Sequence, residues 1–333
     1  MRRLMSLAIT PNRSWCLLVA CCLSFSLTGC TNDGGRLEAH DVTSTIARLP
    51  DGSVGRPLRV MLVPADGGTE DGTRADFEPL FNAITDHYGL HFEIRVGQSY
   101  NTVIEAMDND LVDVAFFGAV SYQIARDRGA AELLAVEQRG GKSVYYSAIF
   151  HRADSGFTTL TDLKGKKVAF GDMHSTSSFS YPLAMLLTAG LDPARDLSSI
   201  YLAGSHANSL QALANGEVDA ACASLDSYEK AVTAGKLDPK NVTSLRKSVP
   251  IPSPPLAMHV DLAPEIKTTL KNALRDIHEK PGVSADSIRG YGGKRVDLYN
   301  VDYPEEEFNA AMAPLAGITR ELREAILRKA GER

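Results

Sequence analysis

The chain has 333 residues, of which 44% are hydrophobic and 23% are charged, so it is long enough to form one or two globular units with their own cores. It has 35 basic against 41 acidic residues, and its formal net charge is -6 at pH 7. This acidic balance argues against nucleic acid as a partner.

Residues 1–29 have the pattern of a secretory signal peptide. Three arginines accompany an apolar run over residues 15–27, which is too short to span a bilayer. The run ends in Leu-Thr-Gly before Cys30, which resembles a bacterial lipobox and predicts acylation of Cys30; the alternative is an ordinary signal peptide with a coincidental cysteine. We expect a protein on the periplasmic side of the bacterial cell envelope, held to a membrane through Cys30, with residues 30–57 as a tether.

The cysteines fit this interpretation. Residues 1–29 contain three arginines, no acid and three of the five cysteines, so their removal changes the net charge from -6 to -9. With Cys30 acylated, Cys222 is left alone, and the sequence predicts no intramolecular disulfide.

Strands and helices then alternate along the chain. The first group comprises strands at 58–63, 92–96 and 112–117 and helices at about 75–88 and 100–109. The third strand is apolar almost throughout, as expected where helices cover both faces of a parallel sheet. The alternation predicts an α/β fold with a largely parallel sheet.

A second group of elements repeats this alternation. It comprises strands at 145–151, 167–170, 199–202 and 220–223 and helices from about 179 and at 209–215. After a proline-rich segment at 250–255, the sequence predicts a strand at 256–260 and helices at 264–278 and 304–329. We expect two lobes, the first from 58–148 and 251–333 and the second from 149–250, with a ligand in the cleft between them.

Three consecutive hydroxyl residues follow the strand at 167–170 and open a helix. These are Ser175, Thr176 and Ser177, here called the hydroxyl run. The first turn of a helix has unpaired backbone N–H groups and the positive end of the helix dipole, so it can bind an oxyanion without lysine or arginine. The simpler alternative is that one of the three only caps the helix.

Familiar catalytic motifs are missing from the sequence, which has no G-x-S-x-G, H-E-x-x-H, G-x-x-x-x-G-K-[ST] or G-x-G-x-x-G. The eight histidines do not cluster at ligand spacing, so we expect no metal and no cofactor. Ser175, His206 and Asp226 could be combined into a hydrolytic triad. Three equivalent hydroxyls argue against one activated nucleophile, however, and we expect no catalysis.

Several segments together resemble the phosphate, phosphite and phosphonate-binding proteins of ABC importers. They are residues 99–106, 112–118, 145–147, 162–166, 170–172 with the hydroxyl run, His206, and 215–220. The resemblance extends in order from about residue 58 to 260. It implies a two-lobed periplasmic-binding-protein fold of type II that closes by hinge motion and, as a monomer, delivers a small oxyanion to an ABC permease.

The resemblance also implies which residues hold the ligand. The family's contacts to phosphorus oxygens correspond to Tyr100, Tyr145, Ser175, Thr176, Ser177 and His206. Asp226 stands where the family has an acid, and there a carboxylate would accept a hydrogen bond from a protonated oxyanion.

Two positions depart from the family pattern. Ser178 follows the hydroxyl run where glycine is common, which predicts a stiffer loop. Pro254 stands where aminoalkylphosphonate receptors have a second acid, so no carboxylate is expected there for a ligand ammonium group. The sequence therefore favours phosphite, phosphate or methylphosphonate over 2-aminoethylphosphonate.

Two other classes of protein stay open. The same fold could serve as a periplasmic sensor that presents its ligand to a histidine kinase, and Cys222 could then bind a thiophilic oxyanion such as arsenite. A periplasmic enzyme is the third alternative.

Overall fold

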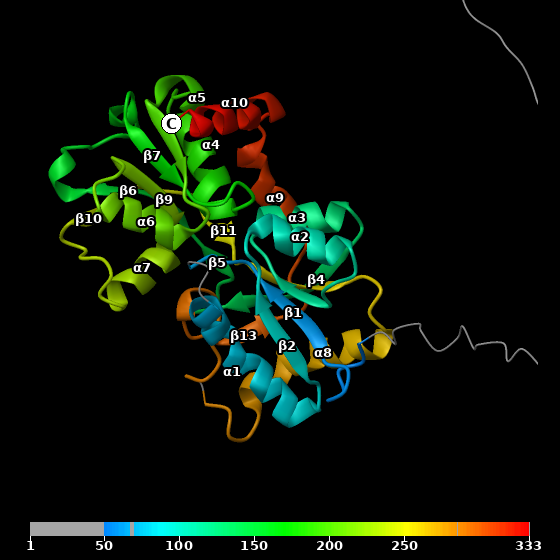
Figure 1. Ribbon diagram of the computed structural model, residues 1–333. Helices are drawn as coiled ribbons and strands as arrows, with labels where there is room; N and C mark the ends of the chain where they lie inside the picture. The colour runs from blue at the N-terminus through cyan, green and yellow to red at the C-terminus, as the bar shows by residue number, and fades with distance from the viewer. Residues whose placement is uncertain (1–49, 67–69, 285, 333) are drawn as a thin grey trace, which may run out of the picture. The chain divides into compact units, whose positions relative to one another are not determined.

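Two mixed β-sheets, each covered by helices, organise the computed structural model (Figure 1). The structure describes residues 50–66, 70–284 and 286–332, which belong to one unit. The predicted signal peptide, Cys30 and most of the predicted tether lie outside these residues. Within the described part of the chain, no helix combines the length and apolar character needed to cross a membrane.

The first lobe is built on a sheet of six strands. In spatial order they are β13 (Leu298–Asn300), β4 (Ala131–Gln138), β12 (Pro255–His259), β3 (Val114–Phe116), β1 (Leu58–Leu62) and β2 (Phe92–Val96). β1 pairs in parallel with β2 and β3, whereas β12 lies antiparallel between β3 and β4. The prediction of a largely parallel sheet is therefore only partly right, because β12 and β13 return from the C-terminal part of the chain in the opposite direction.

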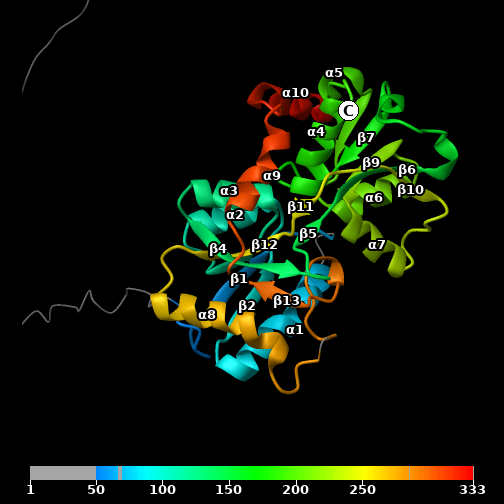
Figure 2. The same cartoon turned by 180° about the vertical axis from the view of Figure 1, so that it is seen from behind.

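Helices cover both faces of this sheet, because its buried strands are apolar on both sides. They are α1 (Glu70–Tyr88), α2 (Tyr100–Asp108), α3 (Ala119–Asp127) and α8 (Pro264–Asp276). α1 packs with α8 and α2 packs with α3, on opposite sides of the sheet in both ribbon views (Figures 1 and 2).

The second lobe is built on a sheet of five strands. In spatial order they are β10 (Val242–Lys247), β6 (Ser147–Arg152), β9 (Ala220–Ser224), β7 (Lys167–Phe170) and β8 (Ser199–Leu202). Its helices are α4 (Tyr181–Thr188), α5 (Pro193–Asp196), α6 (His206–Ala214) and α7 (Leu225–Thr233). Alternate strand residues enter two separate apolar clusters. One contains Phe179 and Leu183 near α4, and the other contains Leu210 and Leu213 of α6.

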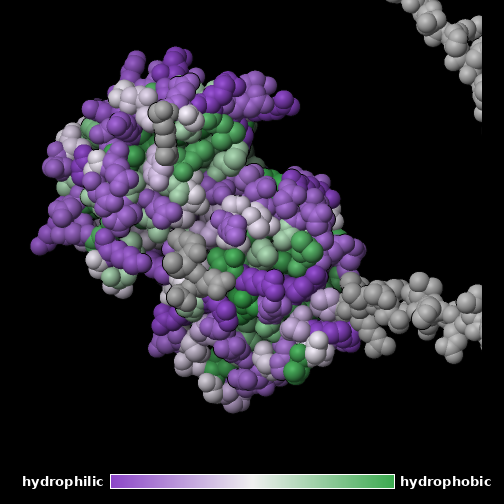
Figure 3. All heavy atoms as spheres, viewed as in Figure 1, coloured by the Kyte–Doolittle hydropathy of each residue, from purple (hydrophilic) through white to green (hydrophobic). Residues whose placement is uncertain are grey.

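A two-stranded ladder lies between the sheets. β5 (Val144–Tyr145) pairs antiparallel with β11 (Ile251–Pro252), and this pairing joins the passages of the chain near residues 148 and 250. Hydrophilic residues cover most of the face shown in Figure 3, as expected when the apolar side chains are in the interiors of the two lobes.

The C-terminal region differs from the single helix expected at 304–329. α9 (Glu306–Met312) ends before Pro314, and α10 (Arg320–Gly331) begins after Gly317. α10 then packs on β8 and α5 of the second lobe, although the sequence analysis had assigned residues 251–333 to the first. Helices α3 and α5 and strands β4, β10, β11 and β13 are among the elements that the sequence did not predict.

The packing of α10 can be tested by comparing two neighbouring residues. Ile326 is fully buried in the second lobe, whereas Leu327 is 40% exposed. Ile326→Ala should lower the free energy of unfolding by about 2–5 kcal/mol, because it leaves a cavity. Leu327→Ala should change it by less than about 0.5 kcal/mol. Urea unfolding measures both, and equal effects would contradict this packing.

Candidate anion-binding site

A small cavity lies between the strand ends of the two lobes. It is lined by Val63, Ala65, Tyr100, Phe116, Gly118, Tyr145, Ser175, Thr176, Ser177, His206, Pro254 and Tyr291. Six of the seven ligand-binding residues predicted from the sequence are in this group, and Asp226 is not. The free volume is about 10 Å³, close to the minimum needed for one water molecule. An ion with three or four oxygens requires the lobes or the side chains to move before it can enter.

Four helices begin at the cavity. α2 starts at Tyr100, α3 is capped by Gly118, α6 starts at His206, and a five-residue π-helix, η4 (Thr176–Ser180), leads into α4. Two of these starts come from each lobe. Their unpaired N–H groups and dipoles make the centre of the cavity electropositive, although no lining side chain is charged when His206 is neutral.

The hydroxyl run lies at the start of η4 and is almost fully buried. Ser175 is the helix cap, because its Oγ accepts a hydrogen bond of 3.1 Å from the Ser178 backbone N–H. The Thr176 Oγ1 accepts a hydrogen bond of 2.8 Å from Val120 of α3, which joins the two lobes. The capping alternative therefore holds for Ser175, yet Ser175, Thr176 and Ser177 all line the cavity.

Ser178 faces away from the cavity. Its side chain lies against Gly171, where a β-carbon would collide with it, and its buried Oγ has no hydrogen-bond partner among the described residues. π-Helices are rare and are often found at functional sites, and this one begins with Thr176 and Ser177, which both line the cavity.

The hydrogen bonds of His206 determine which of its ring nitrogens carries the proton. Its Nδ1 accepts a hydrogen bond of 2.9 Å from the Ser224 backbone N–H, so the proton of the neutral ring is on Nε2. Nε2 lies 3.3 Å from the Ser175 Oγ and 3.4 Å from the Tyr100 hydroxyl. Burial lowers the pKa of His206 to about 4, so the ring is a neutral donor at physiological pH.

The two tyrosines enter from the first lobe. Tyr100 and Tyr145 are each 3% exposed, and burial raises the pKa of both phenols, which therefore keep their protons. The Tyr145 hydroxyl interacts with Ser177 and Thr176. The donors of the cavity are thus hydroxyls, an imidazole and backbone N–H groups, all without formal charge.

Asp226 lies in the first turn of α7, outside the cavity. Its Oδ1 is 2.9 Å from Arg139 and 2.6 Å from the Lys294 Nζ. The role expected for Asp226, as acceptor of a proton from the ligand, is therefore not supported, because its carboxylate is held by two cations. The N-cap of α7 is Ser224, two residues before Asp226.

These positions also argue against the hydrolytic triad, because Asp226 lies apart from Ser175 and His206. A catalytic histidine donates its Nδ1 proton to a carboxylate and uses a bare Nε2 as the base. In this protein Nδ1 is an acceptor and Nε2 carries the proton, so His206 cannot take a proton from Ser175.

Tyr291 is a polar lining residue that the sequence did not predict. Its hydroxyl lies 2.6 Å from the Ser224 Oγ and 2.8 Å from the Ser227 Oγ, and its ring meets those of Tyr145 and His206 edge-on. The local signal for a turn here is the sequence Gly-Tyr-Gly-Gly at 290–293. Glycine favours positive φ values, and Gly292 and Gly293 both have them.

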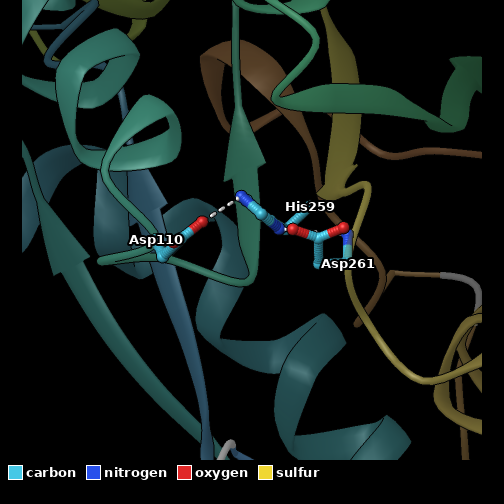
Figure 4. A group of neighbouring side chains, drawn as sticks. All are labelled: Asp110, His259 and Asp261. Atoms are coloured by element: carbon cyan, nitrogen blue, oxygen red, sulfur yellow. Dashed lines mark hydrogen bonds and ion pairs between the residues drawn. The ribbon is translucent and has the colours of Figure 1, made fainter.

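Two other candidate groups lie elsewhere. Cys222 is fully buried within β9 and is not in the cavity lining, which removes the basis for a thiophilic site. Asp110, His259 and Asp261 lie near one another, as Figure 4 shows. His259 uses Nδ1 to accept from the Asp261 backbone N–H and Nε2 to donate to Asp110, so the imidazole offers no free lone pair to a metal.

Two lobes that enclose a site of helix N-termini and neutral donors define a solute-binding protein for a small anion. Residues 68–291 match the family described as ABC transporter, phosphonate, periplasmic substrate-binding protein. The chain belongs to this family, whose members are periplasmic.

Named relatives agree. The chain is 33% identical over 226 residues to the phosphate-import protein PhnD of Mycolicibacterium smegmatis, covering 64% of this chain and 70% of that protein. It is 25% identical over 218 residues to the phosphonates-binding periplasmic protein of Escherichia coli, covering 64% of each chain.

Solved structures share the fold. The binding protein of a phosphonate ABC transporter from Pseudomonas aeruginosa has a TM-score of 0.66 at 21% identity, covering 83% of this chain and 95% of that one. PhnD1 from Prochlorococcus marinus, in complex with methylphosphonate, has a TM-score of 0.65 at 16% identity, covering 77% and 96%. The predicted two-lobed fold is confirmed.

The low pKa of His206 predicts a loss of stability in acid. The unfolded chain binds a proton near pH 6.5, whereas the folded protein resists protonation down to about pH 4. The stability from His206 is therefore complete above pH 6.5 and is lost as the pH falls toward 4. Between pH 7.5 and 4.5 this loss should be about 2–3 kcal/mol.

Urea unfolding without ligand, at both pH values, measures this loss. His206→Gln should reduce the pH dependence by that amount, whereas the exposed His87→Gln should leave it unchanged. Equal pH dependence in wild type and His206→Gln would contradict the assignment of a neutral, buried imidazole.

Proposed function

We propose that this protein is the receptor of an ABC importer for a small phosphorus oxyanion, namely phosphite, phosphate or methylphosphonate. The main support is the convergence of four helix N-termini on the hydroxyl run and the Nε2 of His206. Each is a donor that an oxyanion can use in place of water. The receptor binds and releases its ligand without catalysis.

The rest of the lining limits the substituent on phosphorus. Val63, Ala65, Phe116 and Pro254 are apolar, and Tyr291 closes the cavity beside them. A ligand ammonium group would find no carboxylate in this lining and would lose its hydration without compensation. We therefore expect 2-aminoethylphosphonate to bind far more weakly than the three small anions.

Closure of the lobes completes the site. Tyr100 and Tyr145 come from the first lobe and the hydroxyl run from the second, so only the closed form presents all donors together. We place the hinge at the passages near residues 148 and 250, beside the β5–β11 ladder. The closed form would then be recognised by the permease.

The affinity should depend on the hydroxyl run. Loss of one hydrogen bond to a charged ligand costs about 1.5–3 kcal/mol, or roughly ten- to a hundredfold in affinity. Ser175→Ala and Thr176→Val should each weaken the binding of phosphite, phosphate and methylphosphonate to this extent. Titration calorimetry of the mature chain measures the effect, with 2-aminoethylphosphonate as the ligand expected to fail.

A matched control is Ser178→Ala, which removes a buried hydroxyl that does not line the cavity. It should leave the affinity unchanged. If wild type binds none of the three anions, or if both hydroxyl-run variants bind like wild type, the proposed function is wrong.

We also propose that the receptor is a lipoprotein anchored through Cys30, on the strength of the Leu-Thr-Gly-Cys sequence. Cys30→Ser should abolish acylation and release a chain that still binds its ligand. Fractionation and intact-mass measurement test this, and a wild-type chain without acyl groups would refute it.

A further inference from the structure

One side chain of α7 bridges two acidic residues of the other lobe. The Nζ of Lys230 lies 2.5 Å from the Asp76 Oδ2 and 3.2 Å from the Asp66 Oδ2, and it also donates to the Gly72 carbonyl oxygen at 3.3 Å. Asp76 belongs to α1, and Asp66 follows β1. The side chains of both acids are at most 10% exposed, so the ammonium group is their main source of neutralisation.

The same cluster continues to the wall of the cavity. The Asp66 Oδ1 accepts a hydrogen bond of 2.6 Å from the Ser227 hydroxyl of α7, and the Ser227 Oγ lies 2.8 Å from the Tyr291 hydroxyl. Lys230 and Ser227 belong to the second lobe, whereas Asp66 and Tyr291 belong to the first. Each of the three contacts in this series, Lys230 to Asp66, Asp66 to Ser227 and Ser227 to Tyr291, therefore joins one lobe to the other.

This cluster, consisting of Asp66, Asp76, Ser227 and Lys230, is here called the interlobe latch. It lies outside the cavity, and Tyr291 stands between the two. No member of the latch lines the cavity, so none of them has a direct contact to offer to an oxyanion.

The positive charge of Lys230 favours the closed arrangement of the lobes. When the lobes separate, water can solvate Asp66, Asp76 and Lys230 individually. When the lobes meet, the two carboxylates are buried near one another, and the Lys230 ammonium group supplies the positive charge that compensates them. Removal of Lys230 therefore destabilises the closed form more than the open form. The measured affinity falls with the closed fraction, because the complete site exists only in the closed form.

We propose that Lys230 is a positioning residue, which holds the lobes closed around the ligand by neutralising Asp66 and Asp76 across the interface. This inference rests on the proposed function for one of its two readouts, the affinity for an oxyanion. The second readout is the distribution of open and closed forms without ligand.

The test variant is Lys230→Met, which keeps an unbranched apolar side chain one heavy atom shorter than lysine and removes the charge. Phosphite and methylphosphonate should each bind roughly ten- to a hundredfold more weakly. Small-angle X-ray scattering without ligand should show a larger radius of gyration than in wild type. Lys236→Met, at an exposed position of the same lobe, should change neither result.

Two further variants distinguish charge from packing. Adding Asp76→Asn to Lys230→Met removes one of the uncompensated carboxylates, and it should restore part of the affinity. Ser175→Ala should weaken binding while leaving the scattering without ligand unchanged, and Asp76→Asn should not rescue it. If Lys230→Met does not fold, Lys230→Gln replaces it, with the same two expected results.

The pH provides a signature that a purely structural role would not give. Asp76 faces Lys230 of α7, Asp66 after β1 and the backbone of Gly293, with Tyr299 of β13 nearby. Burial already raises the pKa of Asp76 to about 6, and loss of Lys230 raises it further. At pH 5 the carboxyl group is then protonated, so the affinity defect of Lys230→Met should be smaller at pH 5 than at pH 8.

Wild-type affinity together with wild-type scattering in Lys230→Met would overturn the proposal. So would an affinity defect that is equal at pH 5 and pH 8 and that Asp76→Asn does not reduce. If wild type binds none of phosphite, phosphate and methylphosphonate, the proposed function fails, but the scattering comparison still decides whether Lys230 holds the lobes closed.

Discussion

An oxyanion that leaves water must exchange its hydration for protein donors, and in this protein those donors are uncharged. The hydroxyl run, the Nε2–H of His206 and the phenols of two tyrosines meet at the starts of four helices. Such an arrangement compensates the ligand's charge by dipoles rather than by a salt bridge. It requires His206 to stay neutral, and the backbone N–H of Ser224 enforces this by occupying Nδ1.

The formal charges of the cleft are gathered outside the cavity. Asp226 meets Arg139 and Lys294, and Lys230 meets Asp66 and Asp76, all across the contact between the lobes. This separation gives the two groups different tasks. We propose that the neutral cavity recognises the ligand and that the interlobe latch controls how firmly the lobes stay together. Because the cavity holds only about 10 Å³ of free volume, binding and opening are coupled.

Much of this arrangement could be predicted from local sequence. The strand at 167–170 and the helix start after Ser175 follow from apolar runs and capping chemistry. The family resemblance predicted Tyr100, Tyr145 and His206 as ligand contacts. The role of Asp226 could not be predicted, since Arg139 and Lys294 are 87 and 68 residues away in the chain. Tyr291 was missed for a similar reason. It reaches the cavity through the glycine turn at 292–293, and no motif marks that approach. The antiparallel insertion of β12 likewise depends on the return of the chain from the second lobe.

The central claim is that neutral donors at the helix starts hold the anion. A crystal structure of the complex with methylphosphonate tests this most directly. The account predicts the three oxygens within hydrogen-bonding distance of the hydroxyl run, the His206 Nε2 and the two tyrosine hydroxyls, with the methyl group against apolar lining residues. An anion found instead on Arg139, Lys230 or Lys294 would contradict it.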